Sequence, residues 1–305
     1  MKTHLIRAVF VILLCQAPAN AIVLFGKDNT GNLSDPGTGT PWESVARLSN
    51  ADGSVIGGSG IYLGNGYILT AAHVGPFASV TFDGSTFFMH DGVNPVQVGS
   101  TDMKILRLTS TPTVAAVGLY TGSLELSTTG TLVGWGVGRA ATTAVNATVV
   151  PWGAASTSDK RWGTNTPKGT IAGFSYSTYI FDALQTSLGS SSGTPTGTGS
   201  DEAAASLYDS GSGMFQNIGG TWFLTGITSV VTQKGGASTS TYGNDVPATT
   251  LPGSPTGIQL PGGSGDINIF VRVSSYATQI NTLIPEPSSL LLALTSACLF
   301  LRRKR

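Results

Sequence analysis

The chain has 305 residues, with 16 basic and 16 acidic side chains. This balanced charge gives no basic patch of the kind that binds nucleic acid, so no nucleic-acid partner is expected. The two cysteines, Cys15 and Cys298, lie near the two ends of the chain. The body therefore has no internal disulfide, and its stability must come from a packed core.

Residues 1–21 have the pattern of a secretory signal peptide. Lys2 and Arg7 are followed by an apolar stretch over residues 8–15 and by a small-x-small site ending at Ala21. A short buried helix is the alternative, but the position at the very N-terminus favours a signal. We therefore expect an exported protein whose mature body begins at Ile22.

Residues 22–284 form the expected body, which is long enough for one large domain or two small barrels that share a cleft. Short runs rich in β-branched and aromatic residues alternate with Gly, Asn and Asp, which predicts an all-β fold. Helical periodicity is absent until residues 276–283. The glycine-rich stretches 189–200 and 235–265 are predicted to be loops.

A histidine follows an apolar run that we interpret as the end of a strand. His73 comes after residues 67–69 (Tyr-Ile-Leu) and a Thr-Ala-Ala sequence. His90, by contrast, lies in a Met-His-Asp-Gly sequence that resembles a hairpin end, so we interpret it as surface structure. A lone histidine is more often structural than catalytic. Residues 58–66, which lead into His73, favour the catalytic role because they resemble the strand that precedes a catalytic histidine.

An acidic residue heads the next run of alternating apolar positions. Asp102 precedes residues 103–108, Met-Lys-Ile-Leu-Arg-Leu. Asp83 and Asp91 each precede a glycine and fit turns instead. Asp102 is thus the candidate to orient a histidine base, and simple polarity at a strand edge is the alternative.

A serine in a tight, glycine-rich turn is the candidate nucleophile. Residues 208–215 read Tyr-Asp-Ser-Gly-Ser-Gly-Met-Phe, which places Ser210 directly after an acid. A serine hydroxyl needs a base to take its proton and a third group to orient that base. Ser212 is the rival nucleophile, but no acid precedes it, and an ordinary Ser/Gly turn is the structural alternative.

Taken together, these segments resemble the chymotrypsin/trypsin-like serine proteases. Three further segments, at residues 131–136, 225–229 and 270–276, resemble later landmarks of that family in the same order. The resemblance implies two six-stranded antiparallel β-barrels with a cleft between them and a short C-terminal helix. It assigns residues 22–125 to the first barrel and residues 126–284 to the second.

The resemblance also assigns roles to residues. His73 is implied as the base, Asp102 as the orienting acid and Ser210 as the nucleophile, with the backbone N–H groups of Tyr208 and Ser210 as the oxyanion hole. Tyr208 departs from the family, which has a glycine there, and a positive φ would strain its backbone. Gly213 replaces a proline.

Substrate binding is implied for Ala204 at the base of the specificity pocket, for Ser229 in the strand that binds the substrate backbone, and for Val231 on the pocket wall. Ala204 cannot pair with a Lys or Arg side chain, and Val231 would narrow the entrance, so a small or medium apolar specificity is expected. An alignment shifted by a few residues would bring Asp201 or Glu202 to the pocket base instead. The long segment between residues 229 and 270 departs from the family and could cover the cleft.

Activation is implied for Ile22 and Asp209. Cleavage after Ala21 would free an Ile-Val terminus, and in trypsin-like zymogens such a terminus pairs with the acid before the nucleophile. We expect signal-peptide removal itself to supply this terminus. The alternative is that residues 22–25 simply open the first strand and that Asp209 pairs with an internal group.

The C-terminal residues 285–305 resemble the PEP-CTERM sorting signal of Gram-negative bacteria. A Pro-Glu-Pro sequence precedes an apolar run shorter than the roughly 20 residues that span a membrane, and four basic residues end the chain. The resemblance implies an exosortase-type processing enzyme as a partner and membrane contact through this segment before processing. An ordinary membrane anchor is the alternative.

The expected function is therefore that of an exported serine endopeptidase acting on protein or peptide substrates, without a metal or cofactor. Its expected location is the cell envelope, the cell surface or the extracellular matrix of a Gram-negative bacterium. A non-catalytic trypsin-like binding or scaffold protein is the second hypothesis. Another serine hydrolase, such as an esterase, is disfavoured because no Gly-x-Ser-x-Gly elbow in a βα context is present.

Overall fold

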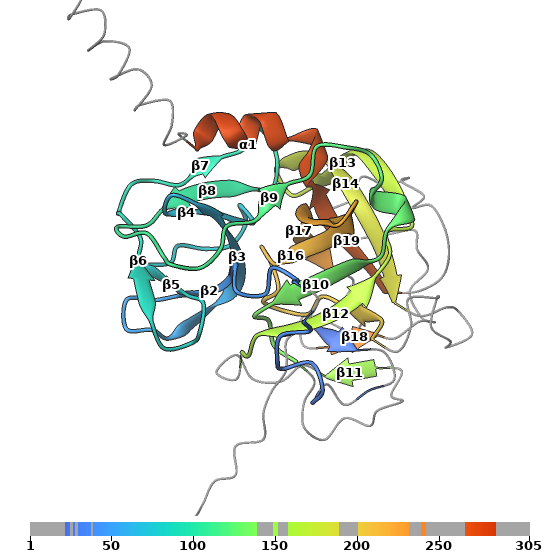
Figure 1. Cartoon of the computed structure of the whole chain (residues 1–305), viewed down its shortest axis with the longest axis horizontal. Coiled ribbons are helices and arrows are strands. Elements are labelled where there is room, and N and C mark those ends of the chain that lie inside the picture. The colour runs from blue at the N-terminus through green and yellow to red at the C-terminus, as the bar shows by residue number, and fades with distance from the viewer. Residues whose placement is uncertain are drawn as a thin grey trace, which may run out of the picture.

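A computed structural model of the chain describes residues 22–24, 27, 30–37, 39–138, 149–151, 158–188, 201–231, 239–241 and 266–284. These residues form two large sheets, two small strand pairs and one short α-helix (Figure 1). The predicted all-β fold is confirmed. The expected signal peptide and C-terminal sorting segment lie outside the described residues.

The first sheet contains seven strands in the spatial order β6-β5-β2-β3-β4-β8-β7. Its central hairpin turns at Asn65, which has φ +54° between two glycines of positive φ, as a tight hairpin turn requires. The strands are β2 (Val45–Ser49), β3 (Val55–Gly64), β4 (Tyr67–Thr70), β5 (Ser79–Thr81), β6 (Phe87–Met89), β7 (Val96–Gln97) and β8 (Lys104–Arg107).

The second sheet contains eight strands, seven of them in the order β12-β10-β16-β17-β19-β14-β13, with β9 paired in parallel to β17. The two sheets thus have seven and eight strands, compared with the six expected for each barrel. The additional strands include β7 and β9, which are two residues long. The strands are β9 (Gly118–Leu119), β10 (Gly130–Gly134), β12 (Arg161–Asn165), β13 (Gly169–Tyr176), β14 (Tyr179–Leu188), β16 (Gly213–Ile218), β17 (Thr221–Val231) and β19 (Asp266–Arg272).

The start of the body is paired with the second half of the chain. Strand β1 (Val23–Leu24) pairs antiparallel with β15 (Ala203–Ala204), close to the segment that carries Ser210. The resemblance assigns residues 22–125, which include β1, to the first barrel, whereas β15 lies in the part of the chain assigned to the second. A second small pair joins β11 (Val149–Pro151) to β18 (Thr239–Thr241).

The two sheets share a hydrophobic core. One buried cluster combines Val45 and Ile61 of the first sheet with Phe215 and Ile227 of the second. Trp135, which follows β10, crosses the boundary: its indole Nε1–H donates to the Val45 carbonyl at 3.0 Å, and its backbone N–H donates to the Ser59 hydroxyl at 2.9 Å. The relative position of the sheets is therefore fixed by packing and by buried hydrogen bonds.

The chain after β19 forms a short 3-10 turn, η3 (Val273–Ser275), and then the helix α1 (Ala277–Leu283). Figure 1 shows α1 beside β7 and β8 of the first sheet, so the predicted C-terminal helix covers the neighbouring barrel. A second 3-10 turn, η1 (Glu125–Ser127), precedes β10. The buried Glu125 carboxylate of η1 accepts two hydrogen bonds from Arg272, at 2.9 and 3.1 Å. Among the described residues, no helix is long and apolar enough to cross a membrane.

Candidate active site

The histidine and the acid meet because their strands are antiparallel neighbours. Thr70, the last residue of β4, pairs with Lys104, the first residue of β8, so the residues after β4 lie beside the residues before β8. The Ala72 N–H donates to the Asp102 carbonyl at 3.2 Å, and the His73 backbone N–H donates to Asp102 Oδ1 at 2.9 Å. This pairing brings the His73 ring to the Asp102 carboxylate.

The Asp102 carboxylate is completely buried and is held by several donors. His73 Nδ1 lies 2.6 Å from Asp102 Oδ2, and the Ser229 hydroxyl of β17 donates to the same oxygen. A carboxylate can only accept hydrogen bonds, so Asp102 fixes the proton of the ring on Nδ1. Nε2, on the other side of the ring, is then free to accept a proton.

Ser210 lies at that free nitrogen. Its Oγ is 2.8 Å from His73 Nε2, which completes a continuous chain from hydroxyl to imidazole to carboxylate. The rival Ser212 is buried, and its hydroxyl is hydrogen-bonded to the Thr228 hydroxyl at 2.6 Å. The structure thus brings His73, Asp102 and Ser210 together and places the Ser212 hydroxyl against β17.

The other titratable candidates have local roles. His90 forms an isolated bridge with Leu108 at the edge of the first sheet. Asp83 accepts hydrogen bonds from the backbone N–H groups of Ser85 and Thr86, which hold the pKa of its carboxyl far below the usual range. Asp91 accepts from the Val93 N–H in the same way. Each of these residues stabilises a turn or strand end outside the triad.

The loop that carries Ser210 is closely fitted to its surroundings. The Ser212 N–H donates to the Asp209 carbonyl at 2.8 Å, the Gly211 N–H to the Thr228 carbonyl at 2.9 Å, and the Ser59 N–H to the Ser210 carbonyl at 2.8 Å. Within the described part of the chain, the N–H groups of Tyr208 and Ser210 donate no such bond. These two N–H groups are therefore available to an oxyanion.

Asp209 points away from Ser210 into the second sheet and is completely buried. Its carboxylate accepts hydrogen bonds from Ser206 N–H at 2.7 Å, Gly136 N–H at 2.8 Å and Ile22 N–H at 3.2 Å. Desolvation raises its pKa to about 6, although these hydrogen bonds act in the opposite direction. The structure thus places Ile22 and Asp209 in direct contact, and Ile22 itself is fully buried.

A cavity of about 270 Å³ opens beside the triad. Ser229 and Val231, which the resemblance assigns to substrate binding, are among the residues that line it. Ala204 does not line it: it is 3% exposed, pairs with Val23 and packs in a small cluster with Val23 and Leu188. The other described lining residues are His73, Tyr176, Ser206, Leu207, Tyr208, Ser210, Thr228 and Val230.

The acids near Ala204 are engaged elsewhere. The Asp201 carboxylate forms an ion pair with Lys27 Nζ at 2.7 Å, and Glu202 is buried in a bridge with Thr164. Neither is among the described residues that line the cavity, so a shift of alignment brings no carboxylate into it. The described walls of the cavity are hydroxyl-bearing and apolar.

Tyr176 lines the cavity although the sequence around it gives no sign of such a role. The Tyr176 ring lies edge-on to the His73 ring, with centroids 5.8 Å apart and an interplanar angle of 83°. Its strand, β13, belongs to the second sheet, and the following strand reaches the loop that bears Asp102: the Ile180 N–H donates to the Ser100 carbonyl at 3.0 Å. Burial raises the Tyr176 pKa, and the Asp102 charge adds to this. Only a long-range contact, which no local motif encodes, could reveal Tyr176.

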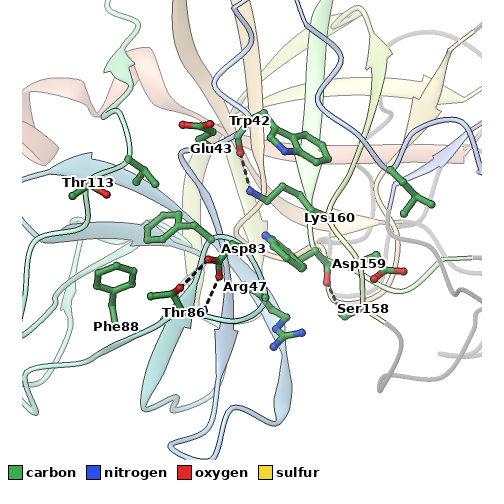
Figure 2. Close-up of a pocket in the computed structure, with 15 residues that line it drawn as sticks. Trp42, Glu43, Arg47, Asp83, Thr86, Phe88, Thr113, Ser158, Asp159 and Lys160 are labelled. Carbon is green, nitrogen blue, oxygen red and sulfur yellow. Dashed lines mark hydrogen bonds between the residues drawn. The ribbon is translucent and has the colours of Figure 1, made fainter.

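A larger cavity, of about 740 Å³, lies at a separate place between the sheets (Figure 2). Its most buried cation, Lys160, donates to the Trp42 carbonyl at 3.1 Å and lies over the rings of Trp42 and Trp135 at 5.1 and 5.3 Å. Burial lowers the Lys160 pKa to about 8. No histidine is among the described residues that line this cavity, so it lacks the nucleophile-and-base pair of the smaller one.

Comparison with solved structures agrees with the fold. Neuropsin, a serine protease expressed in the limbic system of mouse brain, matches with a TM-score of 0.50 and 14% sequence identity, over 83% of this chain and 98% of that chain. The chain therefore has the chymotrypsin-like fold. No protein-family model matches the sequence, and no curated protein matches it.

Proposed function

We propose that the protein is a serine endopeptidase that hydrolyses peptide bonds through an acyl-enzyme. The observation that carries this proposal is the hydrogen-bonded chain from Ser210 Oγ to His73 Nε2 (2.8 Å) and from His73 Nδ1 to Asp102 Oδ2 (2.6 Å). His73 and Ser210 line a cavity of about 270 Å³, where we propose that the peptide binds. A structural Ser/Gly turn has no need of a base oriented in this way.

In the first step, Ser210 Oγ bonds to the carbonyl carbon of the substrate and its proton passes to His73 Nε2. The carbonyl oxygen becomes an oxyanion at the N–H groups of Tyr208 and Ser210. The C–N bond then breaks, and His73 gives its proton to the departing amine. Water repeats the sequence on the ester, with His73 as base, and releases the acid and free Ser210. Asp102 stays ionised and stabilises the imidazolium throughout.

The proposed specificity is for small or medium apolar side chains rather than for Lys or Arg. Val230 and Val231 line the cavity, and no carboxylate is among its described lining residues. A buried cation without an anionic partner is strongly disfavoured. Ser206 and Leu207 line the cavity, whereas Ala204 does not.

We propose that removal of residues 1–21 also completes the site. In the unprocessed chain the Ile22 N–H belongs to a peptide bond and donates to Asp209 at 3.2 Å. Cleavage after Ala21 would turn this donor into an ammonium at the same position. An ion pair there would offset the desolvation that raises the Asp209 pKa.

Export and sorting are proposed from the sequence of the two ends. The N-terminal signal would carry the protein across the cytoplasmic membrane, and the PEP-CTERM-like tail would present it to an exosortase-type enzyme at the cell envelope. The body would then act at the cell surface or in the extracellular matrix. The fold needs neither segment for the contacts described above, since the triad and both sheets lie within residues 22–284.

Labelling with a fluorophosphonate, together with hydrolysis of a peptide library, tests the proposal. The wild type should react and should cleave after small apolar residues, whereas Ser210→Ala should do neither. Ser212→Ala is the matched control, because it removes a hydroxyl two residues away and should keep both activities. A wild type that neither reacts nor hydrolyses would instead support the non-catalytic scaffold, and hydrolysis of esters but not of peptides would support an esterase.

A further inference from the structure

Tyr208 has a backbone conformation that its side chain disfavours. Its φ is +72°, in the left-handed region that glycine adopts readily. Holding another residue there strains the backbone and requires support from the surrounding structure. Tyr208 lies two residues before Ser210 and lines the same cavity. Its conformation therefore bears directly on the geometry of the site.

The support comes from a glycine in β3. Gly57 has φ +80°, and a Cβ atom placed on it would lie 2.2 Å from Tyr208 Cδ1, 2.6 Å from Cε1 and 2.7 Å from Cγ. The Tyr208 ring thus packs directly against the Gly57 backbone, where any other residue would displace it. Both residues have positive φ, and the absence of a side chain on Gly57 makes room for the side chain of Tyr208.

The same strand holds the other side of the nucleophile. The Ser59 N–H donates to the Ser210 carbonyl, and a Cβ on Gly211 would lie 2.2 Å from the Ser59 carbonyl oxygen. Gly211 has φ +82°. Residues 57–59 therefore contact the loop both before and after Ser210, through two positions at which only glycine fits.

We infer that Gly57 is a positioning residue for the oxyanion hole, and that it acts by holding the Tyr208 ring. This inference rests on the proposed function. Because φ describes rotation about the N–Cα bond, a ring fixed on β3 and a backbone fixed at Ser210 together set the direction of the Tyr208 N–H. Gly57 and Tyr208 form a coupled pair. The packing of the Tyr208 ring against Gly57 offsets the strain of the positive φ at residue 208, and a glycine at residue 208 would have no such strain.

A double-mutant cycle tests this coupling. Wild type, Gly57→Ala, Tyr208→Gly and the double variant are compared in kcat and KM for a peptide substrate and in thermal midpoint. Gly57→Ala should lower kcat by about 10²–10³-fold with little change in KM, as expected for loss of one oxyanion donor. Tyr208→Gly loses the ring that holds the N–H but keeps the N–H itself at a φ that glycine accepts, so it should lower kcat by no more than about tenfold. The double variant should recover to within about tenfold of Tyr208→Gly.

Gly53→Ala is the matched control. Gly53 also has φ +80°, and a Cβ there would lie 2.8 Å from the Phe87 ring, but neither residue lines the active-site cavity. This variant should lower the thermal midpoint and leave kcat unchanged. The comparison separates strain at a crowded glycine from an effect on the oxyanion hole.

The inference is overturned if Gly57→Ala lowers kcat equally in the wild-type and Tyr208→Gly backgrounds, or leaves it unchanged in both. If Gly57→Ala fails to fold, recovery of folding and activity in the double variant supports the pair, and failure of both variants overturns it. A wild type no more active than Ser210→Ala would contradict the proposed function instead. The pair would then be judged by thermal midpoints alone, where additive changes overturn it and recovery in the double variant supports it.

Discussion

The contact between Ile22 and Asp209 should make stability fall as pH rises, and signal removal should abolish this fall. The perturbation is a pair of proteins: one begins at Ile22, and the other keeps Asn20 and Ala21 ahead of it. In the longer form the Ile22 N–H is a neutral donor at 3.2 Å from a completely buried carboxylate. In the shorter form the same atom carries a positive charge below the pKa of the terminal amine.

The magnitude follows from the pKa of Asp209. Burial raises it from 3.8 to about 6 in the chain with a neutral Ile22 N–H. A folded-state pKa above the unfolded value gives stability that is present below the unfolded pKa and lost as pH rises through the folded pKa. At 1.36 kcal/mol per pKa unit the full shift is worth ~3 kcal/mol, of which the longer form should lose ~2.4 kcal/mol between pH 4 and pH 7.

The shorter form should not show this loss, because the ammonium favours the ionised carboxylate and lowers its pKa. Near pH 4 the difference in free energy of unfolding between the two forms should shrink or change sign, since a protonated Asp209 leaves the buried ammonium without a charged partner. Above pH 8 the advantage should fade as the terminal amine loses its proton. The stability difference between the two forms is therefore largest between these limits.

Urea unfolding of both forms at pH 4.5, 6 and 7.5 measures the effect. The free energies of unfolding should diverge by ~2 kcal/mol in favour of the Ile22 form between pH 4.5 and pH 7.5, and peptide hydrolysis should follow at pH 7.5. Asp209→Asn removes the titrating group and should abolish the pH-dependent part of the difference. Equal stability and equal activity of the two forms at every pH would refute the reasoning.

Three further outcomes are expected. Alanine at His73, Asp102 or Ser210 should each lower kcat for peptide hydrolysis by several orders of magnitude, and the three losses should not add. Full activity in Ser210→Ala together with loss of activity in Ser212→Ala would identify Ser212 as the nucleophile instead. Val231→Gly should widen the cavity and raise kcat/KM for larger apolar side chains relative to alanine, without cleavage after Lys or Arg; an unchanged profile would remove Val231 from the pocket wall. A protein restricted to residues 22–284 should fold and react with a fluorophosphonate, and failure to fold while the full chain succeeds would make the tail part of the domain.

The fold and the reacting groups could be predicted because short segments encode them. Ser210 follows an acid within a glycine-rich turn, His73 follows a strand end, and Asp102 heads a strand of alternating apolar residues. In each case the local sequence specifies both the backbone shape and the reactive side chain. The antiparallel pairing of β4 with β8 then brings His73 and Asp102 together without any further information.

The walls of the site could not be predicted in the same way. Tyr176 reaches His73 from another sheet, and the contact of Gly57 with Tyr208 joins residues far apart in the chain. Such contacts depend on how the two sheets pack, which no single segment records. The position of Ala204 shows the same limit, since counting back from Ser210 cannot tell that β15 pairs with Val23 and carries Ala204 away from the cavity.

The most direct test of the central claim is the location of the covalent adduct formed with a fluorophosphonate, determined by peptide mass spectrometry of the reacted protein. His73 is hydrogen-bonded to the hydroxyl of Ser210, while the Ser212 hydroxyl is buried against Thr228. We predict a single adduct on Ser210 that is lost in His73→Ala. An adduct on Ser212, labelling spread over several hydroxyls, or labelling that persists without His73 would contradict the account.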